Sequence, residues 1–477
     1  MAEKKTTHVR RRMAGAGMNR VVVPVLTLLV LPLVVGIAFG SGQAPLMLVG
    51  ILLIGGLGAL AVAVSSPQWS FLALAFVLGA APFAVVPGLP LPIVLVLVIL
   101  VWMSTLLHPI ELGRTDPVEL AVYALMGTSL VSVIATAVGV SDITEFIRWV
   151  MATSIIFPLL RLPRPDLQRF GRVFVYGVGG GSAFALAMFF LDKSGSWMNY
   201  LSAIGYGTVG TIGTHLRFYT DGLTQVVRLT GTYVDPNVAG IFTFVGLALA
   251  ITLLRGWPRL IFSGLLASAL LVTLSRSALF SVVVAALVYL VFQRLRTDAR
   301  LGILAGGIAL GAAALSVPAV ADRILNSFGS DDKGTTDRAA ALSDFPASMS
   351  GHWLFGKGWG IAEFTDEVAG YNANYVANSP LVSIYRGGIL VGIAFVLVLA
   401  AGFVVAHRNA RKPAWESGIT GAALVGFSLV ALQLDFPVVT HAPVTMAFVV
   451  LLVFVAADGL VPEKNGASVT DQKVEHV

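Results

Sequence analysis

The chain has 477 residues, of which 57% are hydrophobic and only 12% are charged. A soluble domain carries about 25% charged residues, so this composition excludes a water-soluble globular protein of this length. The mean hydropathy of +0.87 and the recurring apolar runs of about 20 residues predict a polytopic membrane protein. The absence of cysteine excludes disulfides, thiolate metal sites and cysteine nucleophiles.

The formal net charge is +6 and the sequence pI is about 9.6. In a soluble protein this balance would raise the question of nucleic acid as a partner. Here the basic residues cluster in short connections between apolar runs, which is the pattern of cytoplasmic loops in membrane proteins. The charge therefore predicts membrane orientation, and no nucleic-acid partner is expected.

The first apolar run, 21–40, follows a basic N-terminal tail over residues 1–20. The run is too long for a signal peptide and no small-residue cleavage site follows it, so we interpret it as a retained span with a cytoplasmic N-terminus. The full pattern predicts an all-α bundle of about fourteen spans, or twelve to fourteen because the connections within 40–116 are short and nearly uncharged. The runs lie near 21–40, 45–65, 70–86, 89–107, 118–138, 146–160, 173–191, 237–254, 259–274, 277–293, 301–320, 380–405, 416–433 and 440–458.

Basic clusters follow the sixth, eighth, tenth and twelfth of these runs, where a chain that begins inside must be cytoplasmic. They comprise Arg161, Arg164, Arg169 and Arg172, then Arg255 and Arg259, then Arg294, Arg296 and Arg300, and finally Arg408, Arg411 and Lys412. This places both termini in the cytoplasm and two long polar segments outside.

The two extracytoplasmic segments are 192–236, before the eighth span, and 321–379, before the twelfth. The second contains an amphipathic helix predicted over 337–350, with Phe345 and Met349 on its apolar face. The chain thus divides into a cytoplasmic tail 1–20, a transmembrane scaffold 21–191, the outer loop 192–236, spans 237–320, a large outer loop 321–379 predicted to be catalytic, spans 380–458 and a disordered cytoplasmic tail 459–477.

Four arginines are predicted on the outer side: Arg228, Arg276, Arg338 and Arg386. Arg276 lies between two apolar runs with almost no loop, where an uncompensated guanidinium is costly. Snorkelling and a structural salt bridge are the alternatives, and Arg386 has Asp435 as a candidate partner. Several guanidiniums on one side predict an anionic ligand, because arginine matches phosphate oxygens with a planar fork of donors. A lipid-linked pyrophosphate carries its charge at this depth.

Two carboxylates next to these arginines, Asp235 and Asp337, are the candidates for a general base. Asp235 precedes Pro236 and has the alternative role of capping the next helix. No histidine has metal-ligand spacing with another ligand, so no metal site is expected. The chain also lacks a phosphate-binding glycine loop, so neither ATP nor another cofactor is expected.

The motifs together resemble the O-antigen polymerase and ligase superfamily over residues 228–400. The resemblance rests on Arg228-Leu-Thr-Gly-Thr-Tyr-Val-Asp-Pro-Asn237 opening a span, and on Ser275-Arg276-Ser277-Ala278 between two spans. It continues with Arg338 at the start of a helix in a large outer loop, followed by the turn Gly356-Lys357-Gly358-Trp359-Gly360.

The resemblance implies a metal-independent glycosyltransferase in the bacterial cytoplasmic membrane, with its active face outside. Its donor would be an oligosaccharide on undecaprenyl pyrophosphate, its acceptor a glycan, and its further partners membrane lipid and a chain-length regulator. Arg228, Arg276 and Arg338 would stabilise the departing pyrophosphate. The residues in the remaining motif positions would hold substrate, and the tryptophan among them could instead anchor the loop at the membrane interface. These residues are Tyr233, Asn237, Gly358, Trp359, Gly360, Asn378 and Arg386.

One position departs from the family pattern, because Ala377-Asn378 stands where many relatives have His-Asn. If that histidine acts as a base or positioning group, its role is unfilled here or taken by another residue, with His352 as a candidate substitute. The departure weakens the assignment to the ligase branch more than the general assignment.

The sequence leaves several functions open. The favoured one is polymerisation of carrier-linked repeat units, and the alternative within the family is ligase-like transfer to a different acceptor. A lipid-oligosaccharide flippase is the main rival from another class, but it should place its cationic residues along a central cavity. A peptidoglycan glycosyltransferase of the shape, elongation, division and sporulation group and an inactive scaffold are further rivals.

Overall fold

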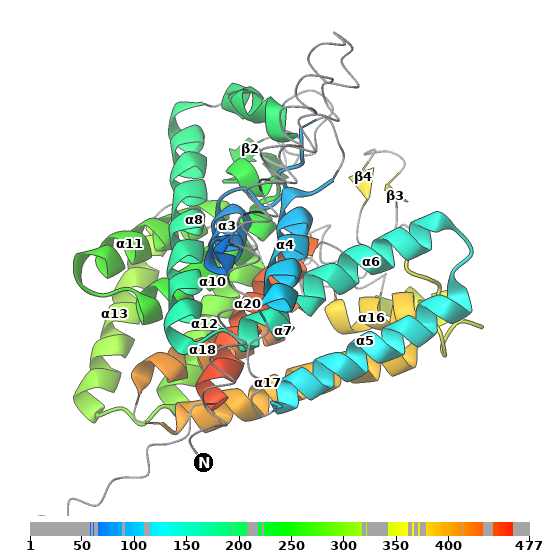
Figure 1. Ribbon diagram of the computed structural model, residues 1–477. Helices are drawn as coiled ribbons and strands as arrows, with labels where there is room; N and C mark the ends of the chain where they lie inside the picture. Colours follow the sequence, from blue (N-terminus) through cyan, green and yellow to red (C-terminus); the bar gives the residue numbers. More distant parts are fainter. Residues whose placement is uncertain are drawn as a thin grey trace, which may run out of the picture.

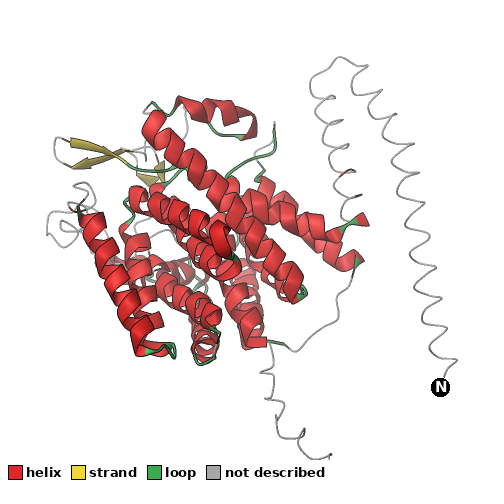
Figure 2. Ribbon diagram, turned by 90° about the vertical axis from the view of Figure 1, so that its left-hand side faces the viewer, coloured by secondary structure: helices red, strands yellow, loops and turns green. Residues whose placement is uncertain are grey.

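The computed structural model describes residues 58, 61, 65–87, 91–108, 115–192, 194–207, 218–221, 224–316, 321, 342–360, 365–366, 371–372, 378–412, 414–432 and 442–460. Within these ranges the chain is helical apart from two short antiparallel hairpins (Figure 2). The predicted tail 1–20 and first span lie outside this part of the chain, as do most of the second span, nearly all of the C-terminal tail, Asp337, Arg338, Ala377 and Asp435.

Most of the helices follow one another with short connections, apart from the long segments before α10 and α16, and Figure 1 shows most of them in one bundle. The N-terminal ones are α3 (Pro67–Ala80), α4 (Ile93–Leu107), α5 (Pro117–Thr136), α6 (Val140–Ser154), α7 (Ile156–Leu160) and α8 (Arg164–Leu191). After the 3-10 helices η1 (Ser196–Ile204) and η2 (Gly231–Tyr233) come α10 (Pro236–Leu253), α11 (Gly256–Thr273), α12 (Arg276–Phe292) and α13 (Thr297–Leu315). The last are α16 (Ser379–Gly387), α17 (Ile389–Ala410), α18 (Trp415–Gly426), the π-helix η4 (Phe427–Ala431) and α20 (Ala442–Leu460).

The two hairpins lie in the polar segments that the sequence separates from the apolar runs. The first pairs β1 (Phe218–Asp221) with β2 (Thr224–Val227), and the second pairs β3 (Thr365–Asp366) with β4 (Tyr371–Asn372). A short helical stretch over 342–348 coincides with part of the predicted amphipathic helix, and Phe345 and Met349 are buried as expected.

Every predicted apolar run from 70–86 onward overlaps a helix, and six helices in the described ranges are long and apolar enough to cross a membrane. They are α5, the continuous α6–α7 segment, α8, α10, α11 and α17. The helical, membrane-type architecture predicted from the sequence is therefore confirmed at this coarse level.

Several boundaries differ from the prediction for local reasons. α6 begins at Val140, ahead of the predicted 146, because Asp142 accepts hydrogen bonds from the Val138 and Gly139 backbone N–H groups and so starts the helix. The predicted twelfth span is two helices, because Gly388 (φ +81°, ψ 178°) interrupts it between α16 and α17. An L side chain rarely adopts that conformation, so the break is specific to glycine.

α3 and α8 pack with their backbones in close contact. A Cβ atom on Gly79 would lie 2.6 Å from the Phe174 carbonyl oxygen, and one on Gly177 would lie 2.5 Å from the Phe76 carbonyl oxygen. Small residues permit this approach in apolar helix pairs, where dispersion and close packing supply much of the association energy.

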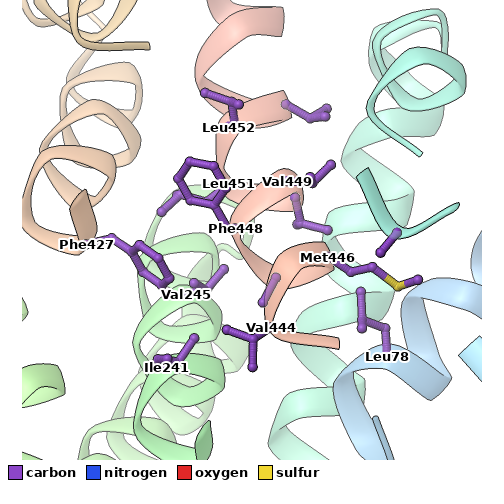
Figure 3. Packing of buried hydrophobic residues seen from close by; sticks show 14 of the residues in the cluster. Leu78, Ile241, Val245, Phe427, Val444, Met446, Phe448, Val449, Leu451 and Leu452 are labelled. Carbon is purple, nitrogen blue, oxygen red and sulfur yellow. The ribbon is translucent and has the colours of Figure 1, made fainter. Parts of the chain in front are cut away.

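α20 is the central helix of the bundle. Residues 443–456 are all buried, so the helix is covered on every side rather than on one stripe. Figure 3 shows Phe448 of α20 on the side of Phe427 of η4, and their ring centroids lie 5.7 Å apart. The core is thus built around the last predicted span, and the earlier helices surround it.

Contacts between helix ends sort into two groups, which define the two ends of the bundle. At one end Arg161 forms an ion pair with Glu119, and the Arg259 guanidinium lies 5.1 Å from the Trp415 ring centroid. The Gln293 side-chain amide donates to the Lys412 carbonyl oxygen (3.2 Å) at this same end. We call it the basic end, because the basic clusters that follow α7, α10, α12 and α17 lie there.

The opposite end holds the sequence motifs, and we call it the motif end. There the Ser132 hydroxyl of α5 donates to the Phe355 carbonyl oxygen (2.8 Å), and the Gly360 N–H donates to the Asp142 carboxylate (2.7 Å). These pairings join the C-terminal end of α5 and the N-terminal end of α6 to the segment 355–360.

Candidate functional site

Arg228 leads the segment 228–237 and lies over the C-terminal end of α11. Its Nε donates to the Thr273 carbonyl oxygen (3.0 Å), and its Nη2 donates to the Asn237 side-chain oxygen (2.8 Å). The Leu229 N–H donates to the Val272 carbonyl oxygen (3.2 Å). Helix ends leave carbonyl groups without intrahelical partners, so these contacts cap α11 and fix the side chain of Asn237.

Arg276 is the first residue of α12 and lies directly after the tight α11–α12 turn. Leu274 makes this turn in the left-handed region (φ +51°), and the Ser275 hydroxyl caps α12 by accepting from the Ala278 N–H. The turn contacts Gly240 of α10, where an added Cβ would lie 2.9 Å from the Ser275 Cβ. The N-terminal ends of α10 and α12 therefore lie together.

The structure thus brings together Arg228, Asn237 and the Ser275–Arg276 turn. Two arginine residues and two helix N-termini lie in this cluster, and the Asp235 carboxylate caps the N-terminus of α10. Arg228 and Arg276 are both half-buried, so their charges are only partly screened by solvent. Two arginine charges against the one carboxylate of Asp235 leave the cluster with a net positive charge, which favours an anion such as a phosphate group.

Tyr233 does not reach a ligand, contrary to the substrate-binding role expected from the sequence. Its side chain is fully buried, and its hydroxyl lies 2.9 Å from the Gly79 carbonyl oxygen and 3.1 Å from that of Val178. The neighbouring Thr232 hydroxyl donates to the Ala80 carbonyl oxygen (2.6 Å). Both residues cap α3, and burial raises the pKa of the Tyr233 hydroxyl.

Gly231 and Val234 show why this segment has a fixed backbone. Gly231 has φ +56°, and a Cβ there would lie 2.5 Å from the Ala185 Cβ of α8. Val234 has φ +66°, which is rare and strained for a β-branched residue. The Tyr233 and Asp235 contacts on either side hold it in place.

Asp235 is the N-cap of α10. Its carboxylate Oδ1 accepts from the N–H groups of Asn237 (2.7 Å) and Val238 (3.2 Å), and the residue is buried. The capping alternative is therefore realised, and a carboxylate held in this way is poorly placed to remove a proton from an incoming hydroxyl.

The Gly-rich turn 356–360 forms a second part of the motif end. The Lys357 N–H donates to the Tyr385 carbonyl oxygen (2.8 Å), and the Gly358 N–H donates to the Arg386 carbonyl oxygen (3.2 Å). The Lys357 ammonium also lies 4.8 Å from the Tyr385 ring centroid. The turn is therefore attached to the end of α16, where the Arg386 residue is only 5% exposed.

Trp359 differs from its expected role in substrate stacking or interfacial anchoring, because its side chain is fully buried. Its ring centroid lies 5.3 Å from that of Phe146 and 4.7 Å from that of Trp149, both in α6. Gly360 contacts the same helix through its hydrogen bond to Asp142. These two residues attach the outer segment to the bundle and leave no ring surface for a sugar.

The remaining predicted residues fall around this turn. Asn378 caps α16 by accepting from the Leu381 N–H (3.1 Å), and His352 is exposed with Nδ1 2.9 Å from the Ser350 carbonyl oxygen. Asp142 was not identified from the sequence, although an acidic residue near the start of an apolar run is the signal that could have found it.

In the part of the chain that the structure describes, no group of three or more His, Cys, Asp or Glu side chains is arranged to hold a metal ion. Comparison with known protein families and with curated proteins finds no match to this sequence.

Proposed function

We propose that this chain is a membrane glycosyltransferase that polymerises oligosaccharide repeat units carried on undecaprenyl pyrophosphate. The observation that carries the proposal is the cluster of Arg228, Asn237 and Arg276 at the N-termini of α10 and α12. A pyrophosphate offers the negative charge and the oxygen acceptors that this cluster suits. Such a ligand also keeps its lipid tail among apolar helices.

In the proposed reaction an acceptor sugar hydroxyl attacks the anomeric carbon of the donor. A new C–O bond forms, the C–O bond to the pyrophosphate breaks, and the carrier pyrophosphate leaves with the electron pair. Arg228, Arg276 and Arg338 stabilise the charge that develops on this leaving group. Since Asp235 caps α10, Asp337 and His352 are the better candidates to accept the hydroxyl proton.

The proposed orientation places the motif end outside the cytoplasmic membrane and the basic end inside. The basic end carries the basic clusters, which include Arg161, Arg259, Arg296 and Lys412. The positive-inside rule assigns such clusters to the cytoplasmic side. About fourteen spans with both termini inside complete this arrangement. The substrate, a lipid-linked glycan, would then be joined to its acceptor on the outer face.

Transfer to a different acceptor, as in a ligase, uses the same donor chemistry and is the nearest alternative. A flippase is disfavoured by the position of Arg228 and Arg276 at helix ends, because a flippase needs its cationic residues along a central path. Ala377 stands where many relatives have a histidine, which weakens the ligase assignment more than the general one.

The test is reconstitution of the purified protein in liposomes with a carrier-linked repeat unit, followed by gel separation of the products. A ladder of lengths is expected from a polymerase. Transfer only to an added acceptor would replace the polymerase proposal with the ligase one. Movement of donor across the membrane without new glycosidic bonds would contradict both.

A further inference from the structure

A cavity of about 290 Å³ lies between α12, α17 and α18, away from the motif end. Its lining is mostly apolar and includes Val288, Phe403 and Val425. Phe292 and Leu429 also line it and are 51% and 54% exposed, so the cavity opens toward the outside of the helix bundle. In a membrane-spanning chain that outer surface faces lipid.

Gln293 supplies a polar group in this otherwise apolar wall. The residue is 2% exposed, its Nε2 donates to the Lys412 carbonyl oxygen (3.2 Å), and its Oε1 has no hydrogen-bond partner. Oε1 lies over Gly418, another lining residue, because a Cβ there would come within 2.1 Å of it. A buried acceptor without a partner costs about 1–3 kcal/mol, so a ligand that donates a hydrogen bond here would remove a penalty.

Basic groups surround the same end of the cavity. His407 lines it, the exposed Arg294 and Arg411 are next in the chain to lining residues, and an Arg300 nitrogen donates to the Gln293 carbonyl oxygen (3.3 Å). Glu416 in the first turn of α18 and Asp298, which pairs with Arg296, are acidic residues near this group, and the arginines outnumber them. The balance of charge favours an anionic headgroup over a zwitterionic one.

We propose that this cavity binds one acyl chain of an anionic phospholipid whose headgroup carries a hydroxyl donor, of the phosphatidylglycerol type. The chain fills the apolar space, the phosphate lies among Arg294, Arg300 and Arg411, and the hydroxyl donates to the Gln293 Oε1. The site lies at the basic end and is independent of the proposed transferase chemistry.

Native mass spectrometry of the full-length protein, delipidated in detergent, tests this with four lipids of identical acyl chains. Phosphatidylglycerol has both the charge and the donor, phosphatidylmethanol only the charge, phosphatidylethanolamine a donor without net charge, and phosphatidylcholine neither. We expect phosphatidylglycerol to be retained at least about tenfold better than phosphatidylcholine, which corresponds to about 1.4 kcal/mol. The other two lipids should fall between them.

Leu429→Trp should block the mouth of the cavity and lower phosphatidylglycerol retention about tenfold. The matched control is Val396→Trp, because Val396 on α17 is similarly exposed (50%) and does not line the cavity.

Arg411→Gln, at an exposed position, should reduce the preference for the charged lipids without altering folding. Equal retention of phosphatidylglycerol and phosphatidylcholine, or equal effects of the two tryptophan variants, would overturn the proposal. Equal retention of phosphatidylglycerol and phosphatidylmethanol would overturn the role of Gln293.

Discussion

At the scale of single residues, the segment 228–237 has a structural role that its sequence pattern alone does not reveal. Arg228 caps α11, Thr232 and Tyr233 cap α3, and Asp235 caps α10. One short segment thus satisfies backbone groups at three helix ends. These residue types are therefore required by the fold whether or not a ligand binds.

Tyr233→Phe tests the capping role directly. Removing the hydroxyl leaves the Gly79 carbonyl oxygen in a buried site without this partner, which should lower the free energy of unfolding by about 1–3 kcal/mol. Thermal unfolding in detergent measures the effect. Tyr200→Phe is the matched control, because Tyr200 is 84% exposed and should tolerate the change. Equal unfolding temperatures for the two variants would contradict the capping account.

At the scale of elements, the apolar runs predicted helices well, but not where helices break or how motifs pack. Hydrophobicity alone cannot locate the break at Gly388, because the predicted apolar run 380–405 continues across it and the cause is a backbone angle. The burial of Trp359 was likewise not predictable, since its partners Phe146 and Trp149 are more than 200 positions away in the sequence. The local pattern predicted the cap at Asp235 as an alternative role, whereas the cap that Asn378 forms on α16 was not predicted, because Asn378 was expected to hold substrate.

Gly388→Ala should disrupt the joint between α16, α17 and the turn 356–360. The position has φ +81°, and a Cβ there would lie 2.0 Å from the Leu354 carbonyl oxygen, so the backbone must move. We expect a loss of thermal stability and faster proteolysis near residues 353–360. Gly264→Ala is the control, because no atom lies within 4 Å of a Cβ at that helical position. A Gly388→Ala protein as stable as the control would show that the joint tolerates a side chain.

At the scale of the whole molecule, charge and span length predict that successive helix ends alternate between the basic end and the motif end. In the structure Arg161 pairs with Glu119 at the basic end, and Ser132 contacts Phe355 at the motif end. The motif end divides into a cluster on α10–α12 and a turn attached to α16 and α6. The sequence could predict that these motifs share one end. It could not predict that the turn packs against α16 and α6.

Membrane orientation can be measured directly, because the natural chain has no cysteine. Tyr200→Cys places a thiol at an exposed position of the motif end, and Thr297→Cys places one at the basic end. In intact cells an impermeant maleimide should label the first variant and should label the second only after permeabilisation. The opposite labelling would invert the proposed orientation.

The central claim is that the motif-end arginines hold the pyrophosphate of the donor, and donor turnover by the Arg276→Ala variant tests it most directly. Release of carrier pyrophosphate in proteoliposomes should fall by about 10²–10³ relative to the natural chain, because one charged contact to the leaving group is lost. Arg276→Lys keeps the charge but loses the planar fork, so it should recover part of the rate. The control is Arg296→Ala at the basic end, whose side chain is 88% exposed and whose loss should leave turnover unchanged. Near-normal turnover by a folded Arg276→Ala protein would contradict the account.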